Sequence, residues 1–387
     1  MESDPAILRA TSQGSRLRPV RRMEVTLSSH PLARTLRTYR WDGGHCSLFQ
    51  EHLHSPLTMP QPPFSWKRPG HWLYQLWYRP LAAVQRSRRE GGPLEQWKNH
   101  RGRQAMRTAA IRLPAMPVRS PQQGEPCLIF LTGHAYWEQS AFCLRSLQAQ
   151  VPGRTWPVLF IDDGTLSPAQ WRSLDSAFPG SNVVSGSSLQ RALDALLPVN
   201  RFPTLREHRR YFPLLRKLTD THAARPGPNL VLDADMLFHR RPDELLAWMD
   251  DPSLPMVMTD CQESYGYARS VLATLAPGAI PESINTGICG FETSTIDWNN
   301  LERWTRFLLG TQGSSYFLEQ SLVALLLSGR SHRQLSRDNY QVAPAPAEIL
   351  NLRAVLHHYV ALTKRGYFRH AWRRYASSDD RMPRSDS

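Results

Sequence analysis

The alternation of apolar runs with helical segments, which begins near residue 126, limits the possible folds more than any other feature of the chain. The apolar runs are CLIFLTG (127–133), WPVLFIDDG (156–164) and NVVSG (182–186), and the helical segments that follow them span 137–150, 167–178 and 188–197. The second helical segment starts with Ser167 and Pro168, a capping residue followed by proline at the first helical position. Strands that alternate with helices predict a mostly parallel sheet with helices on both faces, an α/β fold.

The same pattern continues to residue 375, so 126–375 is predicted to be one domain. Further strands are expected at 229–238, 255–260 and 283–291, and further helices at 211–222, 242–251, 298–310 and 314–329. Ligands of such sheets bind beyond the carboxyl ends of the strands. Acidic residues end the runs at 156–164 and 229–238, which makes these two places candidates for a binding site.

Residues 1–125 are predicted to form a basic, partly disordered N-terminal extension. They contain 20 Lys and Arg residues against 8 Asp and Glu residues, so most of the net charge of +14 lies there. A segment near 71–89 has the spacing of an amphipathic helix that carries tryptophans and arginines. Three roles stay open for this helix: packing on the main domain, lying on an anionic membrane surface, or contacting nucleic acid. No nucleic-acid-binding motif accompanies the charge, so binding to nucleic acid is not expected.

The expected location is the cytoplasm, with peripheral contact at the cytoplasmic membrane face as a further option through the basic extension. The chain has no run of about 18 apolar residues, and its first thirty residues lack the apolar stretch of a signal peptide. Its five cysteines form no CxxC pair, which fits a reducing compartment. Residues 376–387 are expected to be a disordered tail.

Two aspartates, Asp233 and Asp235, stand one residue apart where the apolar run of 229–238 gives way. Burying two like charges costs several kcal/mol unless a cation offsets them. In a strand, residues i and i+2 point to the same side. Hard carboxylate oxygens suit Mg²⁺ or Mn²⁺, so the pair is a candidate metal site. The alternative is a solvated turn in which the acids cap the next element.

Six segments in order along the chain resemble motifs of the nucleotide-sugar glycosyltransferases with the GT-A fold, nearest to glycosyltransferase family 8. They are FLTGHAYWEQSAFCLRSL (130–147), LFIDDGTLSPAQWRSL (159–174), YFPLLRKLTD to NLVLDADMLF (211–238), INTGICGF (284–291), FLEQSLV (317–323) and HYVALTK (358–364). The resemblance covers about 127–375. It implies a GT-A, Rossmann-like sheet flanked by helices and a metal-dependent hexosyltransferase whose donor is a nucleotide-diphosphate sugar, most often a UDP-sugar.

The resemblance also implies which residues hold the metal and the leaving diphosphate. Asp233, Asp235 and His358 would bind Mn²⁺ or Mg²⁺, and Lys364 would place a positive charge on the diphosphate. His357 is a competing metal ligand, and a packed or surface histidine is the alternative role for His358. The family often has glycine before the lysine and Pro-Trp after it, and this chain departs from both.

The resemblance assigns the donor and the reacting groups to further residues. Thr132, Gly133, Asp162 and Asp163 would contact the nucleoside, Lys217 the phosphates, Asn285 and Gly287 the donor sugar, and Gln320 and Glu319 the reacting carbon or the acceptor hydroxyl. Asn285 and Gly287 have a turn between strands as their alternative. Lys217, with its neighbour Arg216, has a helix surface as its alternative, and Glu319 has the solvated side of a core helix.

The sequence leaves the acceptor open as a glycan, a lipid-linked or envelope hydroxyl, or a protein, and it leaves the oligomeric state open. Two other functions remain. One is a non-catalytic GT-A-like protein that acts as a scaffold or binds a membrane surface. The other is a phosphatase of the aspartyl-phosphate type, whose acid pair would be expected near the first strand rather than after about 100 residues of domain.

Overall fold

The computed structural model describes residues 92–376. The predicted amphipathic helix near 71–89 and residues 377–387 of the predicted tail therefore lie outside the described residues. Among residues 92–376, no helix is both long enough and apolar enough to cross a membrane.

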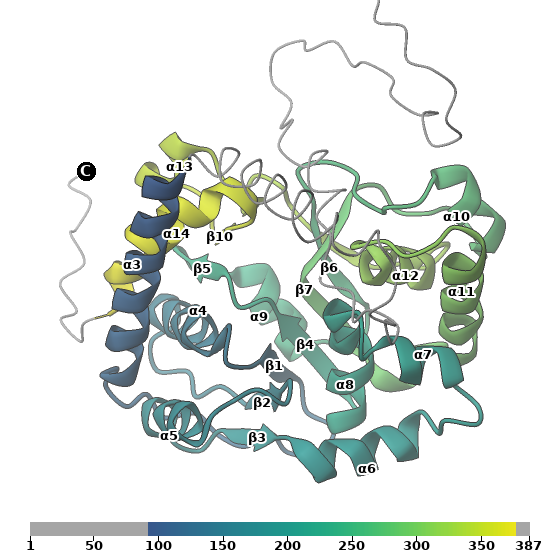
Figure 1. Ribbon diagram of the computed structural model, residues 1–387, viewed down its shortest axis with the longest axis horizontal. Coiled ribbons are helices and arrows are strands. Elements are labelled where there is room, and N and C mark those ends of the chain that lie inside the picture. Colours follow the sequence, from purple (N-terminus) through teal and green to yellow (C-terminus); the bar gives the residue numbers. More distant parts are fainter. Residues whose placement is uncertain (1–91, 377–387) are drawn as a thin grey trace, which may run out of the picture. The chain divides into compact units, whose positions relative to one another are not determined.

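A seven-stranded sheet runs through the domain in the order β3-β2-β1-β4-β7-β6-β8 (Figure 1). Its strands are β1 (Cys127–Thr132), β2 (Val158–Asp162), β3 (Asn182–Val184), β4 (Pro228–Leu232), β6 (Met256–Thr259), β7 (Ile284–Glu292) and β8 (Arg333–Leu335). The first four in chain order pair in parallel, β7 runs antiparallel to both β4 and β6, and β8 is parallel to β6. The predicted α/β class with a mostly parallel sheet is confirmed.

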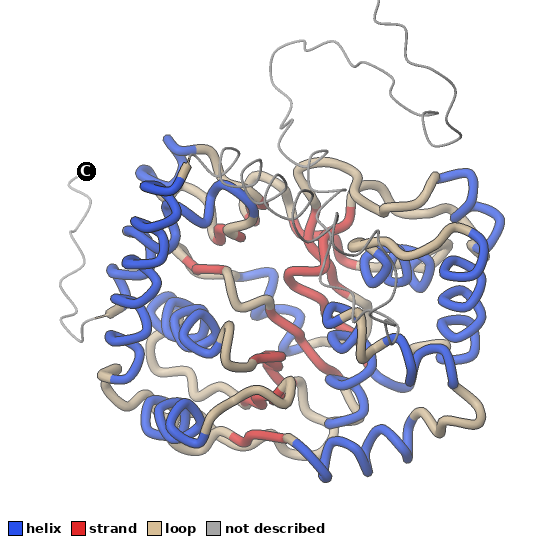
Figure 2. The backbone as a smooth tube through the Cα atoms, viewed as in Figure 1, coloured by secondary structure: helices blue, strands red, loops and turns tan. Residues whose placement is uncertain are grey.

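Helices cover both faces of this sheet, and Figure 2 shows the strands passing between them. The helices are α3 (Pro93–Ile111), α4 (Trp137–Gln150), α5 (Pro168–Ala177), α6 (Gly186–Leu196), α7 (Pro203–His208), α8 (Arg216–Ala224), α9 (Asp243–Asp250), α10 (Arg269–Leu275), α11 (Trp298–Thr311), α12 (Leu318–Leu327), α13 (Pro346–Asn351) and α14 (Lys364–Arg369). The alternating residues of β1 divide between two apolar cores. Leu128 and Phe130 pack with α4, α5 and α9, whereas Cys127 and Ile129 pack with α6, α8, α11 and α12.

Two predicted elements differ in detail from the observed ones. The helix expected at 211–222 is a 3₁₀ turn at Pro213–Leu215 followed by α8, because Pro213 starts a new turn at that point. The strand expected at 229–238 is two strands, β4 and β5 (Met236–Phe238), with the acid pair in the turn between them. β5 belongs to a second sheet of order β5-β10-β9, formed with β9 (Tyr340–Val342) and β10 (Leu356–His358).

Helix α3 lies within the segment 1–125 that the sequence predicts as an extension, and it packs against the domain. Met106 and Ala110 on its inner side are buried in the core that α4 shares. Gly102 lets α3 approach α14, since a Cβ there would stand 2.5 Å from the Phe368 carbonyl oxygen. Arg369 of α14 donates hydrogen bonds to Glu95 and Asn99. The predicted boundary between 125 and 126 therefore falls inside packed structure.

Candidate active site

The acid pair stands in a turn that is fixed at both ends. The Asp233 amide donates to the Gly287 carbonyl of β7 at 2.8 Å, and the Tyr359 amide donates to the Asp235 carbonyl, also at 2.8 Å. The first bond ties the turn to the main sheet and the second ties it to the segment after β10. The turn thus joins two sheets at the carboxyl end of β4, the edge at which ligands of α/β sheets bind.

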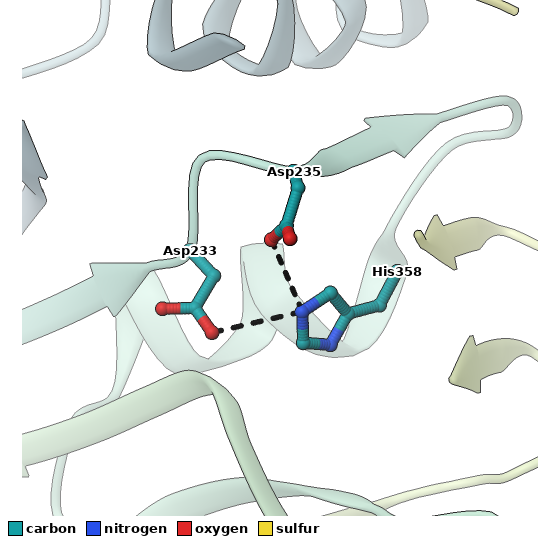
Figure 3. Close-up of side chains that lie close together, drawn as sticks. All are labelled: Asp233, Asp235 and His358. Carbon is teal, nitrogen blue, oxygen red and sulfur yellow. Dashed lines mark ion pairs between the residues drawn. The ribbon is translucent and has the colours of Figure 1, made fainter. Parts of the chain in front are cut away.

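Asp233, Asp235 and His358 point toward one another (Figure 3). The His358 Nε2 atom lies 3.2 Å from Asp235 Oδ1 and 3.6 Å from Asp233 Oδ2. One ligand atom from each residue lies within 4.8 Å of the others. Ligand atoms about 2.1 Å from an octahedral ion stand about 3 Å apart, so this spacing fits Mg²⁺ or Mn²⁺.

The pairing of β10 with β5 decides which of the two neighbouring histidines faces the acids. His358 stands opposite Met236 in this antiparallel pair, immediately beside the turn. His357 points to the other side, as neighbours in a strand do. Its Nε2 lies 3.2 Å from Glu348 Oε1 and its Nδ1 lies 3.2 Å from the Tyr359 hydroxyl. His357 is therefore engaged elsewhere, and His358 is the candidate ligand.

Gly287 leaves the space that the His358 ring occupies. A Cβ at Gly287 would lie 2.7 Å from both Cε1 and Nδ1 of His358, closer than such atoms approach in proteins. The sequence resemblance assigns this glycine to the donor sugar, and the structure places it directly against the imidazole of the candidate metal ligand His358.

Replacing Gly287 by alanine is expected to weaken Mn²⁺ binding about 10- to 100-fold, since displaced neighbours of metal ligands have effects of that size. Calorimetric titration with Mn²⁺ measures it. The control is Gly310→Ala on α11, where an added Cβ meets nothing within 4 Å. Equal Mn²⁺ affinity of the Gly287→Ala variant and the parent chain would show that His358 does not need this space.

Two lysines neutralise the acid pair from opposite sides. Lys217 Nζ lies 2.9 Å from Asp233 Oδ1, and Lys364 Nζ lies 3.0 Å from Asp235 Oδ2. Burial opposes the charged form of Asp235, but Lys364 and His358 outweigh it and hold the pKa of this carboxyl well below its usual value. The Asp235 carboxylate in turn raises the pKa of Lys364. Asp235 is therefore ionised, and the two amines are charged, at neutral pH.

Lys217 is buried and is not on an exposed helix surface, which excludes the alternative that the sequence left open for it. Only 6% of its side chain is exposed. Its Nζ donates to the Thr286 carbonyl at 2.8 Å, and Glu319 Oε2 lies 4.0 Å away. Although burial opposes it, Asp233 and Glu319 raise the pKa of Lys217. The neighbouring Arg216 donates instead to the Asp163 carbonyl at 2.6 Å.

The polar groups beside Lys217 form one buried network around Asp260. Asn285 Nδ2 and Gln320 Nε2 donate to Asp260 Oδ2 at 3.1 and 3.3 Å, and Asn285 Oδ1 accepts from the Gly287 amide at 2.8 Å. Asn285 and Gln320, both predicted site residues, are thus brought together. Asp260 was missed, although it is an acid at the end of the predicted strand 255–260, and that signal could have found it.

Glu319 faces the same cavity from the start of α12. Its Oε2 accepts from the Thr286 hydroxyl at 2.7 Å, and its Oε1 is buried without a hydrogen-bond partner among residues 92–376. Burial raises the pKa of Glu319 to about 7, with Lys217 acting against that rise. The sequence alternative of a solvated acid is excluded, because only 3% of the side chain is exposed.

The four residues predicted at the ends of β1 and β2 have different surroundings. Asp163 lines the cavity, and the space beside Gly133 is filled by its carboxylate, with which a Cβ would overlap. Asp162 Oδ1 instead accepts from the amides of its own turn, and Thr132 is buried behind it with its hydroxyl on Ser140. Of the four, Asp163 is the one with direct access to a ligand.

The acid pair, His358, both lysines and the network around Asp260 open on one cavity of about 1080 Å³, just above the usual range for ligand sites. It is lined by the acid pair, His358, Lys217, Lys364, Asp163, Arg216, Asp260, Asn285, Glu319, Gln320, Tyr136, Phe212 and Tyr316, among others. Tyr136 and Phe212 lie within segments that carry the resemblance and Tyr316 lies just before one, but none of the three was predicted as a site residue.

Ala361, between His358 and Lys364, adopts the left-handed backbone conformation that favours glycine. Its φ angle is +49°, and it lines the cavity. The resemblance places a glycine of the family in this region, so alanine carries the strain that glycine avoids.

Replacing Ala361 by glycine is expected to leave the free energy of unfolding unchanged or to raise it by about 0.5–1 kcal/mol. Denaturant unfolding measures this. In the matched control Ala347→Gly, at an exposed position of helix α13, a loss of about 1 kcal/mol is expected. A loss of the same size at both positions would contradict the strain at Ala361.

The solved structures to which the chain is similar include several glycosyltransferases. The bifunctional glycosyltransferase WbbM has 12% identity and a TM-score of 0.42 over 67% of this chain, which spans about half of WbbM (51%). Mouse xyloside xylosyltransferase 1 has 12% identity and a TM-score of 0.41 over 61% of this chain and 97% of that one. The galactosyltransferase LgtC has 12% identity and a TM-score of 0.41 over 64% and 93%. No family model and no curated protein matches the chain. Similarities of this size carry no argument about activity, which rests on the geometry of the site.

Proposed function

We propose that the chain is a glycosyltransferase that moves a hexose from a nucleoside-diphosphate sugar to an acceptor hydroxyl. The observation that carries the proposal is the meeting of Asp233, Asp235 and His358 with two lysines in one large cavity. These residues come from the turn after β4 and from β10, α8 and α14, so the chain has to fold before they meet. A phosphatase of the aspartyl-phosphate type is disfavoured, because its acid pair follows the first strand.

The charges of the cluster suit a diphosphate leaving group. The two carboxylates and two amines cancel, so a divalent ion held by Asp233, Asp235 and His358 would supply two positive charges to the leaving diphosphate. The Lys364 side chain is 37% exposed and lines the cavity, with its Nζ next to Asp235. From there its ammonium group would also reach a phosphate oxygen of the donor. Lys217 is buried and holds Asp233 in place.

The buried network around Asp260 suits the donor sugar. The carboxylate of Asp260 and the amides of Asn285 and Gln320 line the cavity beside the acid pair, and such groups bond sugar hydroxyls. Glu319, with a pKa of about 7, would accept the proton of the acceptor hydroxyl. Asp163, which follows β2 and also lines the cavity, would face the nucleoside.

A thermal-shift screen of UDP, GDP, CDP and ADP, each with and without Mn²⁺, tests this function. We expect one diphosphate to raise the melting temperature only when Mn²⁺ is also present, because both ligands bind the native state. Hydrolysis of the matching nucleotide sugar then shows turnover. Stabilisation without any hydrolysis of a panel of hexose donors would favour the non-catalytic alternative, and no stabilisation by any pair would overturn the proposal.

A further inference from the structure

The excess of positive over negative charge in the described domain lies at its two ends. Residues 92–112 and 346–376 together contain 11 Lys and Arg residues against 2 Asp and Glu residues. The 233 residues between them, 113–345, contain 20 Lys and Arg residues against 22 Asp and Glu residues. The α/β core is therefore close to neutral, and the whole positive excess lies on the segments that hold α3, α13 and α14.

These two segments lie side by side although more than 200 residues separate them in the chain (Figure 1). Arg369 of α14 bonds Glu95 and Asn99 of α3, and the Arg103 guanidinium lies 5.5 Å from the centre of the Phe368 ring. Their exposed cations define what we call the basic face: Lys98, Arg101, Arg112, Arg353, Arg373 and Arg374. The chain thus collects on one part of its surface the charge that its core lacks.

Large apolar side chains stand exposed among these cations. Trp97 and Leu94 on α3 are 53% and 61% exposed, and Leu350 at the end of α13 is 79% exposed. The Arg101 guanidinium lies over the Trp97 ring at 5.0 Å. Tryptophan and leucine beside arginine suit the boundary between lipid headgroups and acyl chains. Nucleic acid would account for the cations, and a single strand for the tryptophan as well, but it gives no reason for the exposed leucines.

The same segments also form a wall of the catalytic cavity. Asn99 and Arg103 of α3, with Leu362, Arg365 and Phe368 near α14, line it. A surface that docks on the basic face therefore meets the cavity edge without any rearrangement of the domain.

We propose that the basic face docks the protein on an anionic lipid bilayer. Arg101, Arg373 and Arg374 contact the headgroups, and Trp97 and Leu350 enter the interfacial layer. This binding does not depend on the proposed transferase activity. Where that activity holds, docking places the cavity edge next to acceptors that are anchored in the membrane.

Vesicle co-sedimentation of the full chain tests the proposal, with phosphatidylcholine vesicles that contain or lack phosphatidylglycerol. We expect binding only to the anionic vesicles and a decrease with salt. The triple variant Arg101→Glu/Arg373→Glu/Arg374→Glu should weaken partitioning at least about tenfold, and Trp97→Ala should weaken it less. All variants keep residues 1–91, so a change between them belongs to the basic face.

The control is Arg191→Glu/Arg303→Glu, which reverses two exposed charges on α6 and α11, outside the basic face. It should bind vesicles as the parent chain does. Equal binding of the triple variant and the control would overturn the proposal, as would equal binding to neutral and anionic vesicles. Tighter binding to a duplex oligonucleotide than to anionic vesicles would overturn it too and assign the face to nucleic acid. The thermal-shift result with nucleotide and Mn²⁺ should be the same for all these variants, so a failure here leaves the proposed function intact.

Discussion

Replacement of Asp235 by asparagine is expected to lower donor hydrolysis and transfer at least about 10³-fold, because the interactions that stabilise a diphosphate leaving group are worth several kcal/mol. Asparagine keeps the size of the side chain but removes the charge that faces His358 Nε2 at 3.2 Å and Lys364 Nζ at 3.0 Å. Initial rates at saturating Mn²⁺ measure the loss. The joint stabilisation by nucleoside diphosphate and Mn²⁺ should disappear in the same variant.

The matched control is Asp175→Asn, at an exposed position of α5 outside the cavity. It removes a carboxylate of the same kind and should leave both rate and thermal shift unchanged. Full activity of Asp235→Asn at saturating Mn²⁺ would remove the acid pair from the mechanism. Activity that is lost while the joint thermal shift is retained would separate donor binding from turnover.

The strands and helices of the first half could be predicted well because their signals are local. The helix expected at 137–150 is observed with those bounds. Helix α5 begins as predicted, with Ser167 as its cap and Pro168 at the first helical position, and Gln170 completes a capping box. Such signals depend on residues that are neighbours in sequence. The break between β4 and β5 has no local signal, since it follows from the pairing of β5 with β10, about 120 residues further on.

The residues of the candidate site could likewise be predicted only where their signals are local. The spacing of Asp233 and Asp235 is a local signal, whereas the choice between His357 and His358 depends on which side of β10 faces the turn. The burial of Lys217 could not be read from α8, because it requires β7 and α12 to close around the side chain. Asp260 becomes a site residue through Asn285 and Gln320, which approach it from two other elements.

Replacement of Lys217 by methionine is expected to lower the free energy of unfolding by about 3–5 kcal/mol at pH 8, because it leaves a buried charge without its partner. Methionine keeps the apolar length of the side chain, so the lost group is the ammonium that lies 2.9 Å from Asp233 and 4.0 Å from Glu319. Denaturant unfolding without Mn²⁺ measures the change. The matched control Lys98→Met removes an exposed lysine paired with Glu95 and should cost less than about 1 kcal/mol.

The pH dependence of the stability loss in Lys217→Met is expected to identify Glu319 as the buried carboxylate that loses its partner. Burial raises the pKa of Glu319 to about 7 in the folded chain, above its value in the unfolded chain, so its ionisation lowers stability as pH rises toward and through 7. Lys217 restrains this rise in pKa, and the Lys217→Met variant should therefore be less destabilised near pH 5.5, where Glu319 is protonated, than at pH 8. Glu319→Gln should stabilise the parent chain by about 3 kcal/mol at pH 8, and in the Lys217→Met background it should restore most of the loss. Equal destabilisation by Lys217→Met at both pH values, with no recovery in the double variant, would mean that Lys217 acts on Asp233 alone.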